Sequence, residues 1–489
     1  MRYKLTYLFI LSLGLTVSNL SDLMSQISTI SIHTDETILD EPKVPGTFIY
    51  IGFDGNIISS NIGIEIRGGF SQSFSKKTYD IEFWNDPSGE ETIDVQFGDL
   101  REDDDWVLDA MFNEPLRINS YMAHKLWLDM NQLYYQNDEP KAKSGADVMY
   151  TKVTINDEYQ GIYLLSEQVD RFQMKLKKNI NSQIKGELYK GYDSDDAVFF
   201  NNPDETPNNN SMTWSGYEYR YPTDVIDWSN VAELVNFVAN STDADFEQEI
   251  SNRFDIDNLM DYFIFLNLTR MLDNRGKNIY LCRYDVDEPY FLAPWDLDGS
   301  WGLLWNGTND TDTEDILSNR LFNRLIDTNV NGYRQNISDR WNELRNSIIS
   351  DNELESKINE AHQFLLANDI YALESEVWDY EYSISDLNYM FNWLEDRLDY
   401  LDDYFNNITD VEDIGDMGSI NIYPNPAFNQ ITVSGDFDKS SSFRIYNVLG
   451  EVKLKNGILS QGNRIDINDL VSGMYVLEIF GLKKVFYKI

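Results

Sequence analysis

The segment Met271-Leu-Asp-Asn-Arg-Gly-Lys-Asn278 decides the fold of the larger part of this chain. An apolar stretch at helical spacing, residues 259–272, runs into it, and two short apolar runs at 279–284 and 290–293 follow. The second run continues into closely spaced carboxylates in Phe291-Leu-Ala-Pro-Trp-Asp-Leu-Asp-Gly299. This order predicts a polar turn between a buried helix and a β-pair, with acidic side chains where the pair ends.

The spacing of Asp273 and Asn278 suits phosphoryl transfer. That reaction needs a carboxylate to orient the attacking hydroxyl and a nearby amide or carboxylate oxygen to hold metal, and D-x-x-x-x-N supplies both. Asp296 and Asp298 offer hard oxygen ligands for Mg²⁺, which bridges phosphate oxygens in such sites. For each group the alternative is structural: a polar turn at 273–278 and an aspartate-rich helix cap at 296–298.

A glycine- and serine-rich turn, Gly68-Gly-Phe-Ser-Gln-Ser-Phe-Ser75, separates two alternating segments, 62–67 and 78–83, that are predicted strands. The backbone N–H groups of such a loop can cover phosphates, and a lysine on the next strand can pair with them. Lys76 and Lys77 are the candidates. Because neighbours in an extended segment face opposite sides, only one of them can point at a nucleotide. A basic hairpin end is the alternative interpretation.

Glu167 ends a predicted hairpin whose strands, 148–155 and 161–167, flank a turn at 156–160. Its carboxylate could partner the nucleotide-site lysine or a metal, and a solvated strand end is the alternative. Periodic apolar residues predict helices at 116–130, 231–239 and over much of 334–405, with a polar loop at 201–210. A strand-rich half followed by a helix-rich half predicts a two-lobed α+β domain.

The composition excludes several classes of protein. With 83 acidic and 39 basic residues the net charge is −44, so nucleic acid and anionic membrane surfaces are improbable partners. The acidity suits either a soluble extracellular surface or affinity for divalent cations. The single cysteine, Cys282, excludes a disulfide scaffold. The three histidines lack metal-ligand spacing, and no G-x-S-x-G or P-loop motif occurs.

The two ends of the chain differ from its centre. Residues 1–27 predict a signal peptide, because the basic Arg2 and Lys4 precede an apolar run at 7–17 that is too short to span a bilayer. No later segment predicts a membrane span. The main domain is expected at 28–405, a polar, acidic linker at 406–419, and short strands typical of a small all-β sandwich at 420–489.

The central domain resembles the CotH kinase-like family, the spore-coat protein H group, over about residues 45–400. The motifs that carry the resemblance are Arg67-Gly68, Phe74-Ser-Lys-Lys-Thr-Tyr79, Leu116-Arg-Ile-Asn119, Tyr159-Gln-Gly-Ile-Tyr-Leu-Leu-Ser-Glu167, Leu188-Tyr-Lys190, Asp273-Asn-Arg-Gly-Lys-Asn278 and Pro294-Trp-Asp-Leu-Asp298. The family implies a two-lobed, atypical protein-kinase fold that uses ATP and a divalent metal, Mg²⁺ or Mn²⁺, to phosphorylate proteins.

This resemblance assigns roles to residues that match its motifs. Asp273 corresponds to the catalytic-loop aspartate, and Asp296 to the metal-binding aspartate with Asn278 as a second ligand. One of Lys76, Lys77 or Lys190 would meet the nucleotide, with Glu167 supporting that lysine. Where the family tends to show R-G-N-S-S, this chain has Arg67-Gly-Gly-Phe-Ser71, so its contacts to phosphate are expected to differ in detail.

The tail resembles the C-terminal sorting domain of the type IX secretion system. The matching pieces are Ile422-Tyr-Pro-Asn-Pro426, Phe443-Arg-Ile-Tyr-Asn-Val-Leu-Gly450, Leu470-Val-Ser-Gly-Met-Tyr-Val-Leu477 and the basic end from Lys483 to Ile489. The resemblance implies a Bacteroidota-type host, export through the periplasm, and a secreted or cell-surface protein handled by the type IX machinery through residues 420–489.

The sequence therefore favours an exported, ATP- and metal-dependent protein kinase acting on an unknown protein substrate. Two alternatives remain at this stage. The chain could keep a kinase-like fold as a catalytically silent adhesin or scaffold, since ATP is scarce outside cells. It could instead be a polysaccharide-associated protein, with some of its 11 tryptophans stacking on sugars.

Overall fold

The computed structural model describes residues 27–180 and 183–410, and in the C-terminal part 421–434, 442–447, 452–458, 464–468, 470–479 and 482–488. The chain divides into two compact units between Thr409 and Asp410. The predicted signal peptide lies outside the described residues except for Ile27, as do residues 411–419 of the predicted linker. The first residues of that linker are helical, because α10 (Ile384–Asn407) and a 3-10 turn (Ile408–Asp410) extend into it.

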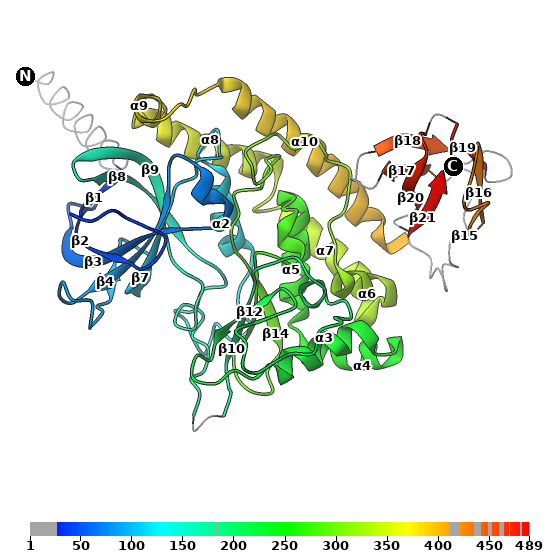
Figure 1. Cartoon of the computed structure of the whole chain (residues 1–489), viewed down its shortest axis with the longest axis horizontal. Helices are drawn as coiled ribbons and strands as arrows, with labels where there is room; N and C mark the ends of the chain where they lie inside the picture. Colours follow the sequence, from blue (N-terminus) through cyan, green and yellow to red (C-terminus); the bar gives the residue numbers. More distant parts are fainter. Residues whose placement is uncertain are drawn as a thin grey trace, which may run out of the picture. The chain divides into compact units, whose positions relative to one another are not determined.

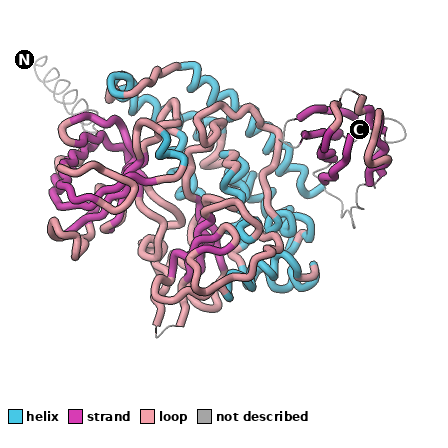
Figure 2. The backbone as a smooth tube through the Cα atoms, viewed as in Figure 1, coloured by secondary structure: helices cyan, strands magenta, loops and turns pink. Residues whose placement is uncertain are grey.

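The N-terminal part of the first unit is a closed β-barrel, in which β1 pairs in parallel with β8 and the other neighbours are antiparallel. Closure leaves no unpaired strand edge. Figure 2 shows these strands gathered together, apart from most helices of this unit. In barrel order the strands are β1 (Ser28–His33), β2 (Val44–Ile51), β3 (Ile57–Arg67), β4 (Thr78–Trp84), β7 (Asp105–Asp109), β9 (Glu158–Ser166) and β8 (Val148–Ile155).

Alternation of apolar and polar residues correctly predicted β3 and β4. Ile62, Ile64, Ile81 and Phe83 all point into the barrel core, as a half-buried strand requires. The predicted hairpin is confirmed as β8–β9, although β9 begins at Glu158. Its turn needs only two residues, Asn156 and Asp157, both left-handed with φ of 51° and 64°, which suits the right-handed twist of the flanking strands.

The helices of the first unit surround a second, larger hydrophobic core. The predicted helix at 116–130 forms as α2 (Asn119–Met130) and starts late because Arg117 is left-handed, with φ of 57°. Helix α5 (Ile256–Thr269) is buried on all sides from Asn258 onward, which explains its continuous apolar sequence. The other helices are α3 (Ser229–Asn240), α4 (Asp243–Arg253), α6 (Arg320–Thr328), α7 (Tyr333–Arg345), α8 (Asp351–Ala367) and α9 (Ile370–Val377).

A five-stranded sheet packs against α5 in this part of the unit (Figure 1). The predicted β-pair is confirmed as two of its strands, the antiparallel β13 (Ile279–Arg283) and β14 (Tyr290–Pro294). In sheet order the strands are β11 (Thr213–Trp214), β12 (Tyr217–Tyr221), β10 (Glu187–Gly191), β13 and β14. Because neighbours are antiparallel, the end of β10, the start of β13 and the end of β14 meet at one edge.

The second unit is all β, so the chain as a whole is α+β with a β-rich C-terminal part, as predicted. Side chains from a three-stranded and a four-stranded sheet share one core, among them Val433 and Leu477, as in a β-sandwich. The strands are β15 (Asn421–Tyr423), β16 (Gln430–Ser434), β17 (Ser442–Asn447), β18 (Val452–Ile458), β19 (Arg464–Asp466), β20 (Gly473–Ile479) and β21 (Leu482–Lys488). Among the described helices of the chain, none has the length and apolarity to cross a membrane.

The separate cores of the two units predict independent unfolding. A chain that stops at Asp410 loses no residue of the first unit's cores, so its Tm should stay within about 2 °C of the corresponding transition in the full chain. Differential scanning calorimetry of both proteins measures this. A large drop in Tm, or loss of a cooperative transition, would mean that the first unit depends on residues 411–489.

Candidate functional site

A cavity of about 540 Å³ in the first unit collects most of the predicted site residues. Most of its wall comes from four places: the β3–β4 connection, the end of β7 with the segment after it, the turn after α5, and the sheet edge formed by β10, β13 and β14 with the segment that follows β14. The barrel and the helical part therefore both contribute side chains. Asp273, Asn278, Asp296, Asp298, Lys76 and Lys190 all line it, whereas Lys77 and Glu167 do not.

The sheet edge brings Asn278 and Asp296 together although 18 residues separate them. Asn278 immediately precedes β13 and donates its backbone N–H to Gly191 O, at 2.8 Å. Asp296 follows β14, where Trp295 N–H donates to Asn278 O at 3.0 Å. Both residues are left-handed, with φ of 57° and 59°, a conformation that Asn and Asp tolerate better than most. As a result the Asn278 amide lies 3.2 Å from Asp296 Oδ2.

Asp273 opens a 3-10 turn (Asp273–Arg275) just after α5. The next side chain anchors this turn, because the Asn274 amide donates to Asn278 O at 3.0 Å and to Trp295 O at 2.9 Å. Asp273 itself is 39% exposed and pairs with Lys277 at 3.5 Å. The two sequence stretches that carry the predicted chemistry thus face the same cavity.

Three carboxylates that line the cavity lie close to one another: Asp109 and Asp298 are half-buried, and Asp296 is exposed. Burial among protein atoms is the first cause that raises the pKa of each, although Asp296 keeps access to solvent through the cavity. The charge of Asp296 further raises the pKa of the other two. The Asn113 amide donates to Asp298 Oδ2 at 2.6 Å and so lowers its pKa in part. Repulsion among these carboxylates therefore adds to the effect of burial on Asp109 and Asp298.

Sequence reasoning did not single out Asp109. It ends the apolar run Trp106-Val-Leu108 of β7, a position that resembles many other strand ends in a chain with 83 acidic residues. Its link to the site depends on β7 pairing with β4 in the barrel, which places it in the same wall as Lys76 and Thr78.

Of the two neighbouring lysines only Lys76 reaches the cavity. Its side chain is fully buried, its ammonium group lies 3.2 Å from Glu374 Oε1, and burial lowers its pKa to about 8 although Glu374 raises it. Lys77 turns away and donates to the backbone carbonyls of Gln72, at 2.6 Å, and Phe74. Lys77 therefore stabilises the glycine-rich turn and does not face the cavity.

The expectation that Glu167 supports the nucleotide-site lysine or a metal is wrong. Glu167 is buried just after the end of β9, where it pairs with Lys143 at 2.6 Å and accepts from Arg101 N–H at 2.7 Å and the Gln173 amide at 2.9 Å. Its position follows from the strand ending one residue earlier, at Ser166. The lysine's acidic partner is Glu374, which lies 298 residues beyond Lys76 and has no local signature.

The glycine-rich turn covers one side of the cavity. Gly68 is left-handed, with φ of 109°, and a Cβ there would collide with Ser71 Oγ, so the tight turn requires glycine. The following 3-10 turn (Phe70–Ser73) carries the Phe70 ring, which packs edge-on against Trp305 with centroids 4.6 Å apart. The turn after β3 thereby contacts the segment that follows β14.

These residues fit a metal-bound polyphosphate. The cavity is lined by four cationic side chains, Arg67, Lys76, Lys190 and Lys277, and by four carboxylates, Asp109, Asp273, Asp296 and Asp298. Hard carboxylate and amide oxygens are the ligands that Mg²⁺ and Mn²⁺ prefer. Because the charges balance, a polyphosphate alone would leave an excess of negative charge, which an accompanying divalent cation removes.

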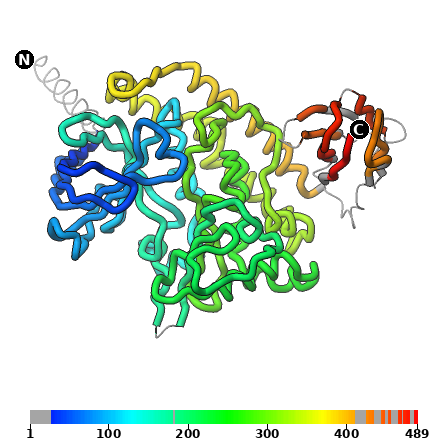
Figure 3. The backbone as a smooth tube through the Cα atoms, viewed as in Figure 1, coloured from blue at the N-terminus to red at the C-terminus, as the bar shows by residue number. Residues whose placement is uncertain are grey.

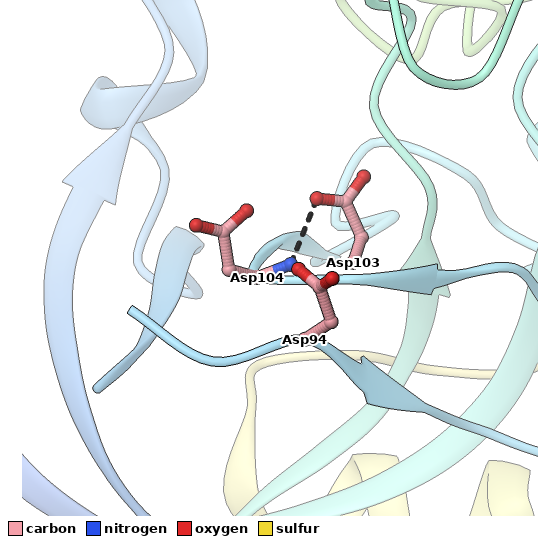
Figure 4. A group of neighbouring side chains, drawn as sticks. All are labelled: Asp94, Asp103 and Asp104. Carbon is pink, nitrogen blue, oxygen red and sulfur yellow. Dashed lines mark hydrogen bonds between the residues drawn. The ribbon is translucent and has the colours of Figure 1, made fainter. Parts of the chain in front are cut away.

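A separate acidic group, Asp94, Asp103 and Asp104, lies beside the short strands β5 (Val95–Gln96) and β6 (Glu102–Asp103) (Figure 4). Among the described residues it is the one set of at least three such side chains with ligand atoms within 4.8 Å of one another. Asp104 N–H donates to Asp103 Oδ1 at 2.8 Å, and Arg101 pairs with Asp103. None of the three lines the cavity, and Arg101 already neutralises Asp103.

Comparison with known proteins agrees with this division of the chain. The family described as CotH kinase protein matches residues 64–401, and the secretion system C-terminal sorting domain matches residues 421–488. "Inner spore coat protein H" of Bacillus subtilis (strain 168) is 25% identical over 243 residues, which is 50% of this chain and 59% of that relative. A sorting domain of this kind implies export. The chain belongs to the CotH kinase protein family and carries a secretion system C-terminal sorting domain.

Proposed function

We propose that this protein is an exported, atypical protein kinase that transfers the γ-phosphate of ATP to protein hydroxyl groups with Mg²⁺ or Mn²⁺. The barrel would form the smaller lobe of a two-lobed kinase fold, and the helical part with its five-stranded sheet the larger one. One observation carries the proposal: Asp273, Asn278 and Asp296 line one cavity together with Lys76 and the glycine-rich turn.

Asp273 is the proposed catalytic residue. Its carboxylate is partly exposed at the cavity, where it can accept a hydrogen bond from a substrate hydroxyl and orient that oxygen for attack. Lys277, 3.5 Å away, is placed to compensate negative charge on the transferred group. The Asn274 amide holds the turn rigid, and a fixed position is what orientation requires.

Asp296, Asn278 and Asp298 would hold the divalent cations. When bound, such ions neutralise phosphate oxygens and help to align the phosphoryl group. Asp296 and Asn278 are already within hydrogen-bonding distance, and rotation of the Asn278 amide turns its oxygen toward the same point. Asn113 orients Asp298 and also donates to Trp305 O at 2.8 Å.

The phosphates would lie between the glycine-rich turn and the lysines. Backbone N–H groups near Gly68 and Gly69 can donate to phosphate oxygens, while Lys76 and Lys190 supply positive charge. The Phe70–Trp305 contact would restrict water at the cavity mouth. The sorting domain supports delivery to the cell surface or medium by the type IX machinery, in keeping with the signal peptide predicted at the N-terminus.

Replacing Asp273 tests the catalytic assignment. Asp273→Asn should lower the rate of γ-phosphate transfer to a protein substrate, or to the protein itself, by about 10²–10⁴-fold, because the hydroxyl loses its general base. Binding of Mg-ATP should persist. Transfer of radiolabelled phosphate measures the rate, and Asp399→Asn, at an exposed position on α10, is the matched control. Equal labelling by wild type and Asp273→Asn would contradict the assignment.

The metal ligands can be tested without activity. Mg-ATP at about 100 times its Kd should stabilise the wild-type protein by about 2.7 kcal/mol, and ATP with a chelator should stabilise it much less. Asp296→Asn should abolish the metal-dependent part, because one charged ligand is lost. Thermal unfolding with and without chelator gives both values. A catalytically silent scaffold without this site would show no Mg-ATP shift at all.

The half-buried charge of Asp298 predicts a gain in stability when that charge is removed. A folded-state pKa raised by burial and by Asp296 means that the ionised carboxylate costs stability as pH rises through that pKa. Asp298→Asn should therefore raise the free energy of unfolding of the metal-free protein at pH 7.5, and with it the Tm, by about 1.4 kcal/mol of free energy for each pKa unit relieved, while weakening Mg²⁺ binding. Denaturation from pH 5 to pH 8 should show the gain growing with pH. A lower metal-free Tm would argue against a strained carboxylate.

A further inference from the structure

Glu374, on α9, occupies the centre of a buried charge cluster next to the cavity. Its Oε1 accepts from Ile162 N–H at 2.7 Å and lies 3.2 Å from Lys76 Nζ, and its Oε2 accepts from Arg117 Nε at 3.0 Å. All three ionisable side chains are at most 1% exposed. A single carboxylate thus compensates two cations that protein atoms almost wholly cover, which makes its position energetically important.

The backbone is shaped to admit this carboxylate. Gly161 is left-handed, with φ of 103°, and a Cβ there would collide with Glu374 Oε1 and lie 3.1 Å from Lys76 Nζ. Glycine is the residue that both the backbone conformation and this close approach require. The barrel strand β9 therefore provides a fitted cradle for a side chain from a helix more than 200 residues away.

Helix α9 and the residues after it also fix the cavity wall. Arg117, held by Glu374, donates to Met111 O at 2.8 Å and to Phe112 O at 3.0 Å, and both of those residues line the cavity. Tyr371 and Tyr380 donate to Leu116 O at 3.0 Å and Pro115 O at 2.6 Å. Figure 1 and Figure 3 show α9 next to β9, so a late segment of the chain braces an early one.

We propose that Glu374 is a positioning residue for the phosphate-binding side of the cavity: from α9 it holds Lys76 at the cavity and, through Arg117, holds the wall at Met111 and Phe112. The C-terminal helices are then an obligatory part of the site. The functional part of this inference rests on the proposed function, which gives Lys76 its contact with phosphate.

The charge state of Lys76 gives the proposal a readout beyond folding. The charged groups that face Lys76 are Glu374 from α9, Arg117 from the segment before α2, and Asp109 from the end of β7. Glu374 raises the pKa of Lys76 against burial and Arg117, which both lower it from its usual range to about 8. Without the carboxylate that pKa falls further, so a larger neutral fraction is present at pH 7.5.

Four variants separate positioning from simple support of the fold. Glu374→Gln removes the charge at constant size, Glu374→Asp shortens the side chain but keeps the charge, and Gly161→Ala pushes the carboxylate out of its cradle. Glu376→Gln, at an exposed position on the same helix, is the matched control. Each full-length protein is first checked for cooperative unfolding.

The first measurement needs no nucleotide. Acylation of Lys76 by an amine-reactive reagent, followed by peptide mass spectrometry at several pH values, reports its neutral fraction and accessibility. Glu374→Gln should speed labelling at pH 7.5 about threefold if the pKa of Lys76 falls by one unit, and about fourfold at most, because the lysine is already partly neutral at that pH. Gly161→Ala should act in the same direction, and Glu374→Asp should restore part of the protection. Glu376→Gln should match wild type.

The second measurement is Mg-ATP affinity from pH 6 to pH 9. Affinity should fall as pH rises through the pKa of Lys76, and in Glu374→Gln that fall should occur at lower pH, with affinity at pH 7.5 reduced about threefold for a one-unit fall in that pKa. Unchanged Lys76 labelling and an unchanged pH profile in a folded Glu374→Gln protein would overturn the inference, as would faster labelling with unaltered Mg-ATP affinity.

Failure of the proposed function would look different. If wild type binds no Mg-ATP, that function falls, and the labelling of Lys76 alone decides whether Glu374 holds the lysine. If Glu374→Gln does not fold, Gly161→Ala and Glu374→Asp decide in the same way. Altered labelling in these variants supports the inference, and wild-type labelling in both overturns it.

Discussion

The antiparallel ladder of β10, β13 and β14 is the constraint on which the candidate site depends. It brings the end of one strand, the start of the next and the end of the third to one edge, and so sets Lys190, Asn278 and Asp296 side by side. Helix α5, buried from Asn258 onward, packs against β14 and delivers Asp273 to the same edge. If this ladder shifted by one residue, the side chains would alternate to the opposite face and the cavity would lose its carboxylates.

The local parts of this arrangement could be predicted from the sequence. Apolar and polar residues alternate in β3 and β4, apolar residues run unbroken in α5, and Asn156-Asp157 marks a tight hairpin, because each pattern depends on neighbours within a few residues. The D-x-x-x-x-N spacing and Asp296 were found for the same reason: helix, turn and β-pair follow one another without interruption. Helix α2 begins later than the spacing of its apolar residues indicated, because Arg117 is left-handed. That backbone conformation leaves no pattern in the sequence.

The parts that escaped prediction depend on contacts between distant segments. Barrel closure rests on the parallel pairing of β1 with β8, more than 100 residues apart. Asp109 joins the site only because β7 pairs with β4, and Glu374 only because α9 reaches β9. Glu167 was easier to single out from the sequence than Asp109 or Glu374, because it follows an apolar strand and lies within a recognisable motif. Its carboxylate is committed to Lys143 and to three N–H donors near it, which only the folded chain reveals.

The charge distribution explains how so acidic a protein could bind an anion. With a net charge of −44, long-range attraction cannot draw a polyphosphate to its surface, so binding has to come from the cavity itself. There four cationic side chains meet four carboxylates, two of the lysines are largely removed from water, and a local field acts that bulk salt screens poorly. Carboxylates at the base of such a cavity repel one another until a cation arrives. This repulsion lowers the stability of the metal-free protein, and the same carboxylates give the cavity its affinity for metal. The buried Glu374 cluster supplies the rigidity that holds the charged groups of the cavity at fixed positions.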